Sequence, residues 1–157
     1  MKAFIIILTS LLVISCATDK NYQIEESSET VTEEAANQDK PQRPYRTEAR
    51  IGKVSKSDPV EIFSAEINGN TLFLEVSYTG GCGLHEFELI GDPAIMKSNP
   101  PKRSVVLTHN ANNDSCESLV NQKIEVDITE LAVTETSGSE IILLLAGHDS
   151  PLKYIYE

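Results

Sequence analysis

Residues 60–78 read VEIFSAEINGNTLFLEVSY, and this stretch decides the fold. Asn68-Gly69-Asn70 separates two strand-like runs, and Asn-Gly is a strong hairpin signal because both residues tolerate positive φ. The second run places its apolar residues at alternate positions, which lie on one face of a strand: Leu72, Leu74, Val76 and Tyr78. The stretch therefore predicts two antiparallel strands, over residues 60–67 and 71–78, with one face buried.

Five more strand-like runs follow, and turn residues such as Gly80-Gly81-Cys82-Gly83 and Asn99-Pro100-Pro101 separate them. The runs lie at residues 85–89, 104–109, 124–128, 140–146 and 152–156. About seven short strands with such turns are typical of a sandwich. We therefore expect an all-β domain, an Ig-like antiparallel β-sandwich of about seven strands, with a small β-barrel as the alternative. The chain has no Trp, so the core Trp of immunoglobulin domains is missing.

The first 16 residues indicate a targeting signal. Met1-Lys2 gives a positive start, and the apolar run at residues 4–14 is shorter than the roughly 20 residues that span a bilayer. This pattern is typical of a signal peptide, which we place at residues 1–15. Val13-Ile14-Ser15-Cys16 resembles the lipobox of bacterial lipoproteins. In that family the Cys becomes the first mature residue and carries acyl chains such as palmitate; the alternative is an ordinary signal peptide with a chance Cys.

The resemblance implies that acylated Cys16 ties the chain to a lipid bilayer, since two or more acyl chains anchor a protein stably. Ala17 stands where some lipoproteins of the inner membrane carry an acidic residue. We therefore expect a cell-envelope protein of the outer membrane, with another envelope protein as a candidate partner.

Composition divides the mature chain into two parts. Residues 16–48 are polar, acidic and poor in apolar side chains, which predicts a disordered tether, and residues 49–157 form the folded domain. The net charge of the chain is −11, and residues 51–157 hold 16 acidic and 7 basic residues, a net of −9. Nucleic acid is not an expected partner, because phosphate contacts need clustered Lys and Arg.

If Cys16 carries lipid, Cys82 and Cys116 remain as an even pair. An exported compartment allows disulfides, so one bridge between them is the first expectation. Cys82-x-x-His85 is also a spacing that holds zinc or copper, with Cys116, His109 or His148 completing the set. A free reactive thiol is the third alternative.

The segment from His109 to Glu117 is the second candidate site. Asn110, Asn112 and Asp114 alternate as oxygen ligands do in calcium loops, but Ser115 and Asn121 stand where such a loop needs Gly and Glu. A turn capped by Asn and Asp side chains is favoured instead. A Cys82–Cys116 bridge would bring four candidate binding or metal residues to one end of the domain: His85, His109, Asp114 and Glu117.

The pattern Gly-Gly-Cys-x-x-His-x-Phe at residues 80–87, followed by His-x-x-x-x-Asp-x-Cys-Glu at 109–117, resembles uncharacterised exported bacterial domains. The resemblance spans residues 72–131 and implies a shared fold and bridge, with no known activity.

Catalytic motifs are missing from the sequence. It contains no Gly-x-Ser-x-Gly elbow, Walker motif or dinucleotide glycine fingerprint, and Glu86 and Glu88 suit a solvated strand face. We expect a non-enzymatic envelope lipoprotein without a cofactor that acts as a binding or accessory module. The alternative is a metal-binding or metal-handling lipoprotein that uses Cys82, His85 and Cys116.

Overall fold

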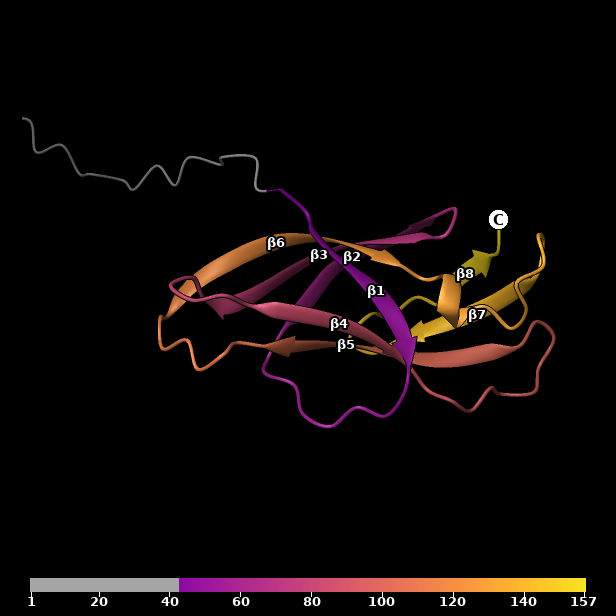
Figure 1. Cartoon of the computed structure of the whole chain (residues 1–157), viewed down its shortest axis with the longest axis horizontal. Helices are drawn as coiled ribbons and strands as arrows, with labels where there is room; N and C mark the ends of the chain where they lie inside the picture. The colour runs from indigo at the N-terminus through magenta and orange to yellow at the C-terminus, as the bar shows by residue number, and fades with distance from the viewer. Residues whose placement is uncertain (1–42) are drawn as a thin grey trace, which may run out of the picture. The chain divides into compact units, whose positions relative to one another are not determined.

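The computed structural model describes residues 43–157, which form one β domain with a single short 3-10 helix (Figure 1). The expected signal peptide, Cys16 and the tether up to residue 42 lie outside the described residues. The elements are β1 (Tyr45–Ile51), β2 (Glu61–Asn68), β3 (Thr71–Gly80), β4 (Glu86–Gly91), β5 (Lys102–Asn110), β6 (Ser118–Asp127), η1 (Thr129–Leu131), β7 (Glu140–Leu145) and β8 (Leu152–Ile155). No helix within residues 43–157 has the length and apolar character needed to cross a membrane.

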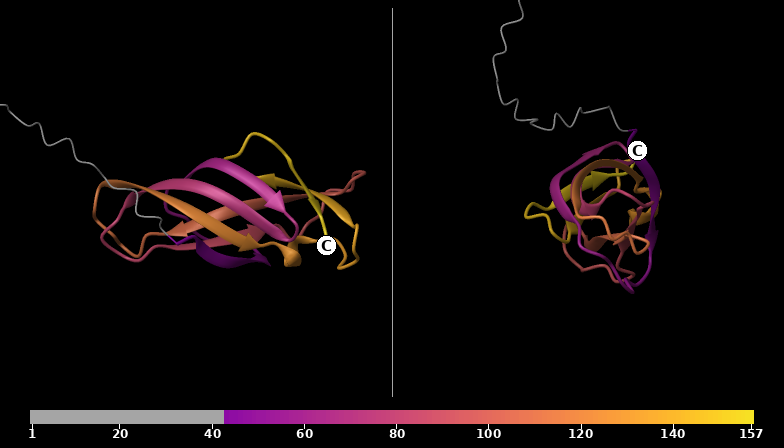
Figure 2. Two further views of the ribbon diagram at one scale, coloured as in Figure 1. Left: turned by 90° about the horizontal axis from the view of Figure 1, so that it is seen from above. Right: turned by 90° about the vertical axis from the view of Figure 1, so that its left-hand side faces the viewer.

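All eight strands belong to one sheet, in the order β2-β3-β6-β1-β4-β5-β7-β8. The end-on view in Figure 2 shows the strands arranged around a common axis, as in a small barrel. The all-β class is confirmed, and the barrel is the architecture that the structure matches. The expectation of antiparallel pairing throughout is not met, because β1 runs parallel to both β4 and β6, and β5 runs parallel to β7.

β1 lies in the middle of the sheet, and its bounds correct the expected start of the domain. Tyr45 pairs with Ile124 of β6, and Ala49 pairs with Leu89 of β4. The composition places residues 45–48 in the tether, but they are strand residues. Tyr45 packs edge-on against the ring of Phe87, with ring centroids 5.3 Å apart. The folded domain therefore includes residues that the composition assigned to the tether.

The interior of the barrel is filled by the alternating apolar residues that predicted the strands. Leu72, Leu74, Val76 and Tyr78 of β3 are all buried, as are the inward positions of the neighbouring strands. Burying one such side chain stabilises a protein by roughly 1.5–3 kcal/mol relative to exposure, so the pleat of β3 fixes which face is inside. The same alternation carries His109 of β5 and Phe87 of β4 into the interior, next to Tyr78.

The ends of the sheet, β2 and β8, are joined by side-chain bonds. Asn70, in the β2–β3 turn, accepts hydrogen bonds at Oδ1 from Tyr154 Oη at 2.9 Å and from the Glu157 amide at 3.0 Å. Its Nδ2 donates to the carbonyl of Glu157 at 3.0 Å. Burial raises the pKa of Tyr154 to about 12, so its hydroxyl stays protonated and remains a donor. Asn70 thus fastens the last strand to the first hairpin.

Candidate functional site

Two loops meet at the end of the barrel that lies on the left in Figure 1: the β3–β4 loop and the β5–β6 loop. Cys82 of the first is bonded to Cys116 of the second, with their α-carbons 5.9 Å apart. The expected disulfide is therefore present. It closes a sequence separation of 34 residues and brings His85, His109 and Asp114 to the same end.

Asp114 is the residue that organises both loops. Its Oδ2 accepts hydrogen bonds from the amides of Cys82 and Gly83, each at 2.9 Å, and its Oδ1 accepts one from the amide of Cys116 at 2.9 Å. Oδ2 also lies 3.0 Å from His85 Nε2. Hydrogen bonds from the amides of Cys116 and Gly83, from the His85 side chain and from the Cys82 amide hold the pKa of Asp114 well below its usual range. The carboxylate is therefore ionised and accepts hydrogen bonds on both oxygens.

The hydrogen-bonded chain continues from Asp114 through two histidines to the backbone. His85 Nδ1 lies 2.8 Å from His109 Nε2, and His109 Nδ1 lies 3.0 Å from the carbonyl oxygen of Pro59. Pro59 belongs to the β1–β2 loop, whose Ser57 Oγ accepts a hydrogen bond from the His109 amide at 3.0 Å. One line of side chains thus connects three loops: β5–β6, β3–β4 and β1–β2.

Aromatic rings enclose the two histidines. His109 stacks on Phe87 with ring centroids 4.9 Å apart, and Tyr78 lies 4.4 Å from the ring of His85. Burial lowers the pKa of His109, and burial together with nearby Asp114 raises the pKa of Tyr78. The side chains of His85 and Asp114 are only 4% and 3% exposed. A substrate in solution therefore has little access to this chain of groups.

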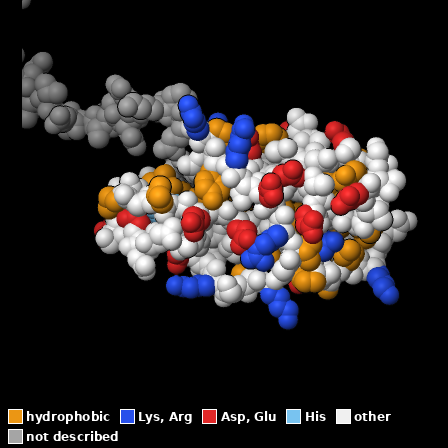
Figure 3. Space-filling view, viewed as in Figure 1, with side chains coloured by type: hydrophobic (Ala, Val, Ile, Leu, Met, Phe, Trp, Pro, Cys, Tyr) orange, Lys and Arg blue, Asp and Glu red, His pale blue; other side chains and the backbone are white. Residues whose placement is uncertain are grey.

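The same end of the barrel carries exposed apolar side chains. Leu84, in the β3–β4 loop, is 85% exposed, and Leu119, at the start of β6, is 69% exposed. Figure 3 shows hydrophobic side chains at this end of the domain. We call the surface formed by Leu84, Leu119 and the Cys82–Cys116 disulfide the disulfide tip. Its loops are held by the disulfide and by Asp114, so the apolar groups stand on a fixed backbone.

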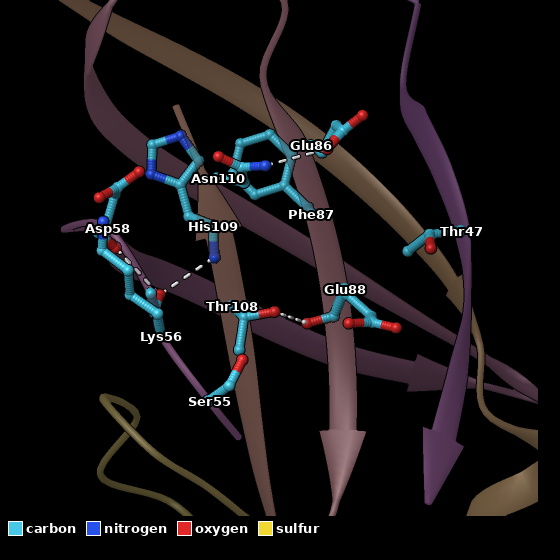
Figure 4. Close-up of a pocket in the computed structure, with 11 residues that line it drawn as sticks. Thr47, Ser55, Lys56, Asp58, Glu86, Phe87, Glu88, Thr108, His109 and Asn110 are labelled. Carbon is cyan, nitrogen blue, oxygen red and sulfur yellow. Dashed lines mark hydrogen bonds between the residues drawn. The ribbon is translucent and has the colours of Figure 1, made fainter. Parts of the chain in front are cut away.

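An open groove of about 540 Å³ lies beside the tip on the outer face of the sheet (Figure 4). The β1–β2 loop, with Lys56 and Asp58, forms one wall, and Thr47 of β1 lies across from it. Asp58 Oδ2 accepts a hydrogen bond from the Ala111 amide at 2.8 Å, and this bond is the main reason that the pKa of Asp58 is lowered. The groove wall and the β5–β6 loop are therefore joined.

The expected site residues do not all come together. His85, His109 and Asp114 form the chain described above, but Glu117 is exposed and makes none of the side-chain hydrogen bonds or ion pairs found within residues 43–157. The expected Asn- and Asp-capped turn is confirmed: Asn110 Oδ1 accepts from the Asn112 amide, and Asn112 and Asn113 have positive φ.

The metal alternative meets a chemical restriction. The sulfur atoms of Cys82 and Cys116 and an oxygen of Asp114 lie within 4.8 Å of one another, but the two sulfurs are bonded to each other. Zinc binds thiolates, so sulfur ligands would become available here only after reduction. His85 directs its two ring nitrogens to Asp114 and His109.

Sequence reasoning missed Ser57 and Pro59, the residues through which His109 holds the β1–β2 loop. A backbone carbonyl accepts a hydrogen bond whatever its side chain is, so no residue pattern marks Pro59. Tyr78 was expected on the inner face of its strand, but its contact with two histidines depends on tertiary packing.

Neither family models nor curated proteins match this sequence. Solved structures do show a similar fold. A NigD-like immunity protein from Bacteroides caccae has a TM-score of 0.58 and 17% identity, over 74% of this chain and 66% of that protein. A putative toxin-related protein from Parabacteroides distasonis has a TM-score of 0.47 and 19% identity, over 72% and 61%. A protein of unknown function from Bacteroides vulgatus has a TM-score of 0.46 and 12% identity, over 73% and 56%.

The matched region therefore spans two thirds or less of each of these proteins. At 17% identity, the likeness to the Bacteroides caccae protein establishes a shared fold.

Proposed function

We propose that this chain is a lipid-anchored, non-enzymatic module of the bacterial cell envelope that binds a partner protein through the disulfide tip. The observation that carries the proposal is the high exposure of Leu84, at 85%, on a loop fixed at both sides. An exposed apolar side chain on a fixed backbone loses little backbone conformational entropy on binding.

The loop that carries Leu84 is fixed by a disulfide and by hydrogen bonds with two residues of the β5–β6 loop. Cys82 is held by the disulfide and, with Gly83, by the Asp114 carboxylate. The carbonyl of Leu84 itself accepts a hydrogen bond from Asn112 Nδ2 at 2.9 Å. Asp114 and Asn112 of the β5–β6 loop thus hold the backbone on both sides of Leu84 in place. A preorganised contact requires such a fixed backbone.

The proposal that the protein is not an enzyme is supported by the last acceptor of the Asp114–His85–His109 hydrogen-bonded chain, which is a backbone carbonyl. An Asp–His pair is part of many catalytic triads, but there the His faces a nucleophile. Here His85 faces His109, which bonds the Pro59 carbonyl, and the side chains are buried. Such a chain holds loops together and leaves binding to the exposed surface.

The proposed localisation to the cell envelope rests on the resemblance of Val13-Ile14-Ser15-Cys16 to a lipobox. Cell fractionation tests it directly. Wild-type chain should sediment with outer-membrane vesicles, and Cys16→Ser should appear in the soluble fraction. Equal membrane association of the two would contradict lipid anchoring without touching the proposal for the tip.

The tip is tested by cross-linking in cells that express the full chain. Leu84→Asp and Leu119→Asp should each remove a cross-linked envelope protein from the captured set. Met96→Asp is the matched control, because Met96 is 45% exposed in the β4–β5 loop, away from the disulfide. A captured set that is the same in all three variants would defeat the proposal.

An immunity role is the second candidate, and the fold similarity motivates it. The Bacteroides caccae protein is described as a NigD-like immunity protein, and such a role would be one form of the partner binding proposed here. Deletion of the gene should then make cells more sensitive to material secreted by competing bacteria. Restoration by the wild-type chain but not by Leu84→Asp would support the role, and unchanged sensitivity after deletion would exclude it.

A further inference from the structure

The His85–His109 pair has a proton count that its hydrogen bonds determine. Asp114 is ionised and can only accept, so His85 Nε2, at 3.0 Å, must carry a proton. The Pro59 carbonyl can also only accept, so His109 Nδ1, at 3.0 Å, must carry a proton. The remaining two nitrogens face each other at 2.8 Å, and this contact needs one proton between them.

Three protons on two imidazoles are one more than two neutral rings carry. Two neutral rings could protonate His85 Nε2 and His109 Nδ1, but then two lone pairs would repel each other at 2.8 Å. Two neutral rings could instead keep the central bond, but then either Asp114 or Pro59 would lose its donor. The geometry therefore belongs to the state of the pair with a single positive charge.

The positive charge belongs on His85. Asp114 is beside it and is negative, whereas His109 is 3% exposed and packs on Phe87. The other titratable groups that face the pair, among residues 43–157, are Asp58 of the β1–β2 loop and Tyr78 of β3. His109 is then the neutral ring, with its proton on Nδ1.

We propose that the His85–His109 pair is a proton-operated latch that holds the β1–β2 loop against β5 through Pro59. When the pair loses its third proton, His85 Nε2 keeps its proton, because a hydrogen bond to a carboxylate is stronger than one to a carbonyl. The proton of His109 moves from Nδ1 to Nε2 to preserve the central bond. Pro59 loses its donor, and the groove wall that contains Asp58 keeps its hydrogen bonds to the His109 backbone and to Ala111 but loses the one from the His109 ring, so it is held less tightly.

Acid breaks the chain at another point, between the two rings. A fourth proton would place two N–H groups opposite each other at 2.8 Å, so the rings would have to separate. The complete His85–His109–Pro59 chain therefore exists only over a window of pH, bounded above by loss of the third proton and below by uptake of the fourth. This latch does not depend on partner binding at the disulfide tip.

Nitrogen NMR of the full chain with ring-labelled histidine tests the proton count. Within the window, His85 should show two protonated ring nitrogens and His109 only Nδ1–H, with coupling across the His85 Nδ1–His109 Nε2 bond. As the pH rises, the His109 proton should move to Nε2. His148 lies outside the cluster and serves as the reference in the same spectrum. Two neutral rings with fixed tautomers across the whole folded range would overturn the proposal.

Amide exchange tests the latch itself. The Asp58 amide donates to the His109 carbonyl at 2.8 Å and reports on the attachment of the loop. Its exchange rate, relative to that of the Leu74 amide, should rise about tenfold when the pair loses its third proton, as expected for one lost hydrogen bond. His109→Gln should remove this pH dependence, and His148→Gln should preserve it. A tautomer change with no change in relative Asp58 exchange would refute the latch.

Discussion

The imidazole of His85 lies against the backbone of Gly80 so closely that a Cβ on Gly80 would stand 2.5 Å from His85 Cε1 and 2.6 Å from Nε2. The same Cβ would stand 3.1 Å from Asp114 Oδ2. Gly80 ends β3, so the last residue of that strand leaves the space in which His85 and Asp114 meet. The absence of a side chain at this position is a condition for the His85–Asp114 contact.

Gly80→Ala should therefore displace His85 and destabilise the domain. Gly138→Ala is the matched control: both glycines have positive φ, but a Cβ on Gly138 meets nothing within 4 Å. Overpacking a filled site costs about 1–3 kcal/mol, so Gly80→Ala should lose that much more free energy of unfolding than Gly138→Ala. Urea denaturation measures both, and equal losses would contradict the close packing of His85.

Reduction of the Cys82–Cys116 disulfide should weaken the domain. The bridge closes a separation of 34 residues, which corresponds to about 4 kcal/mol in the chain-entropy model. The Cys82→Ser, Cys116→Ser double variant should show the same loss under oxidising conditions and no further loss with a dithiol. If a dithiol left the free energy of unfolding of the wild-type protein unchanged, this would contradict the prediction.

Metal content should follow the redox state of these cysteines. The oxidised chain has no thiolate at this end, so it should carry no stoichiometric zinc or copper after dialysis. Elemental analysis with thiol titration under denaturing conditions measures both quantities in one sample. One equivalent of metal in a sample in which Cys82 and Cys116 remain oxidised would show that oxygen and nitrogen ligands suffice.

Acid should weaken the loops through Asp114. The pKa of Asp114 is lower in the folded chain than in the unfolded chain, because three amides and His85 stabilise its charge. Its contribution is therefore complete above the ordinary pKa of an aspartate, about 3.9, and is lost as the pH falls through the folded value. The free energy of unfolding should fall as the pH drops below about 4.

Asp114→Asn tests this assignment, because the amide side chain does not titrate. The acid dependence should be shallower in Asp114→Asn than in the wild type, with Asp149→Asn, an exposed position, as the control. Parallel curves for the wild type and Asp114→Asn would assign the acid sensitivity to other carboxylates.

The start of the folded domain gives a further prediction. A chain that begins at Arg43 keeps all of β1, whereas one that begins at Ala49 loses Tyr45, Arg46, Thr47 and Glu48, the four residues that pair with β6. The shorter chain should lose cooperative thermal unfolding because β1 is the strand that pairs with both β6 and β4 in the middle of the sheet. Similar melting curves for the two chains would contradict the central place of β1.

The strands that the sequence predicts are those with a regular inner face. Leu72, Leu74, Val76 and Tyr78 alternate without a break, and all four are buried. β1 was missed, although Tyr45, Thr47, Ala49 and Ile51 alternate too. Pro44 and the charged residues between these positions favoured a tether, because local composition does not report a partner strand about 80 residues away.

The sequence does not predict which strands pair with each other, for a related reason. Alternation gives the face of a strand but not its neighbour, and short turns suggest antiparallel hairpins. The parallel pairs β1–β4, β1–β6 and β5–β7 join strands that are distant in sequence. At the site, the even number of remaining cysteines predicts the Cys82–Cys116 pair, and the sequence names His85 and His109 as candidate site residues. The hydrogen-bonded line Asp114–His85–His109 depends on tertiary packing, so the sequence alone does not predict it.

The central position of β1 determines the order in which the domain can form. Tyr45 pairs with Ile124, so β1, the first of the described strands to be synthesised, must await a partner made much later. Such distant pairings make folding slow and leave an unpaired edge in the meantime. The barrel can thus close only after β6 has been synthesised, so the N-terminal strand stays without its β6 partner until most of the domain has been made.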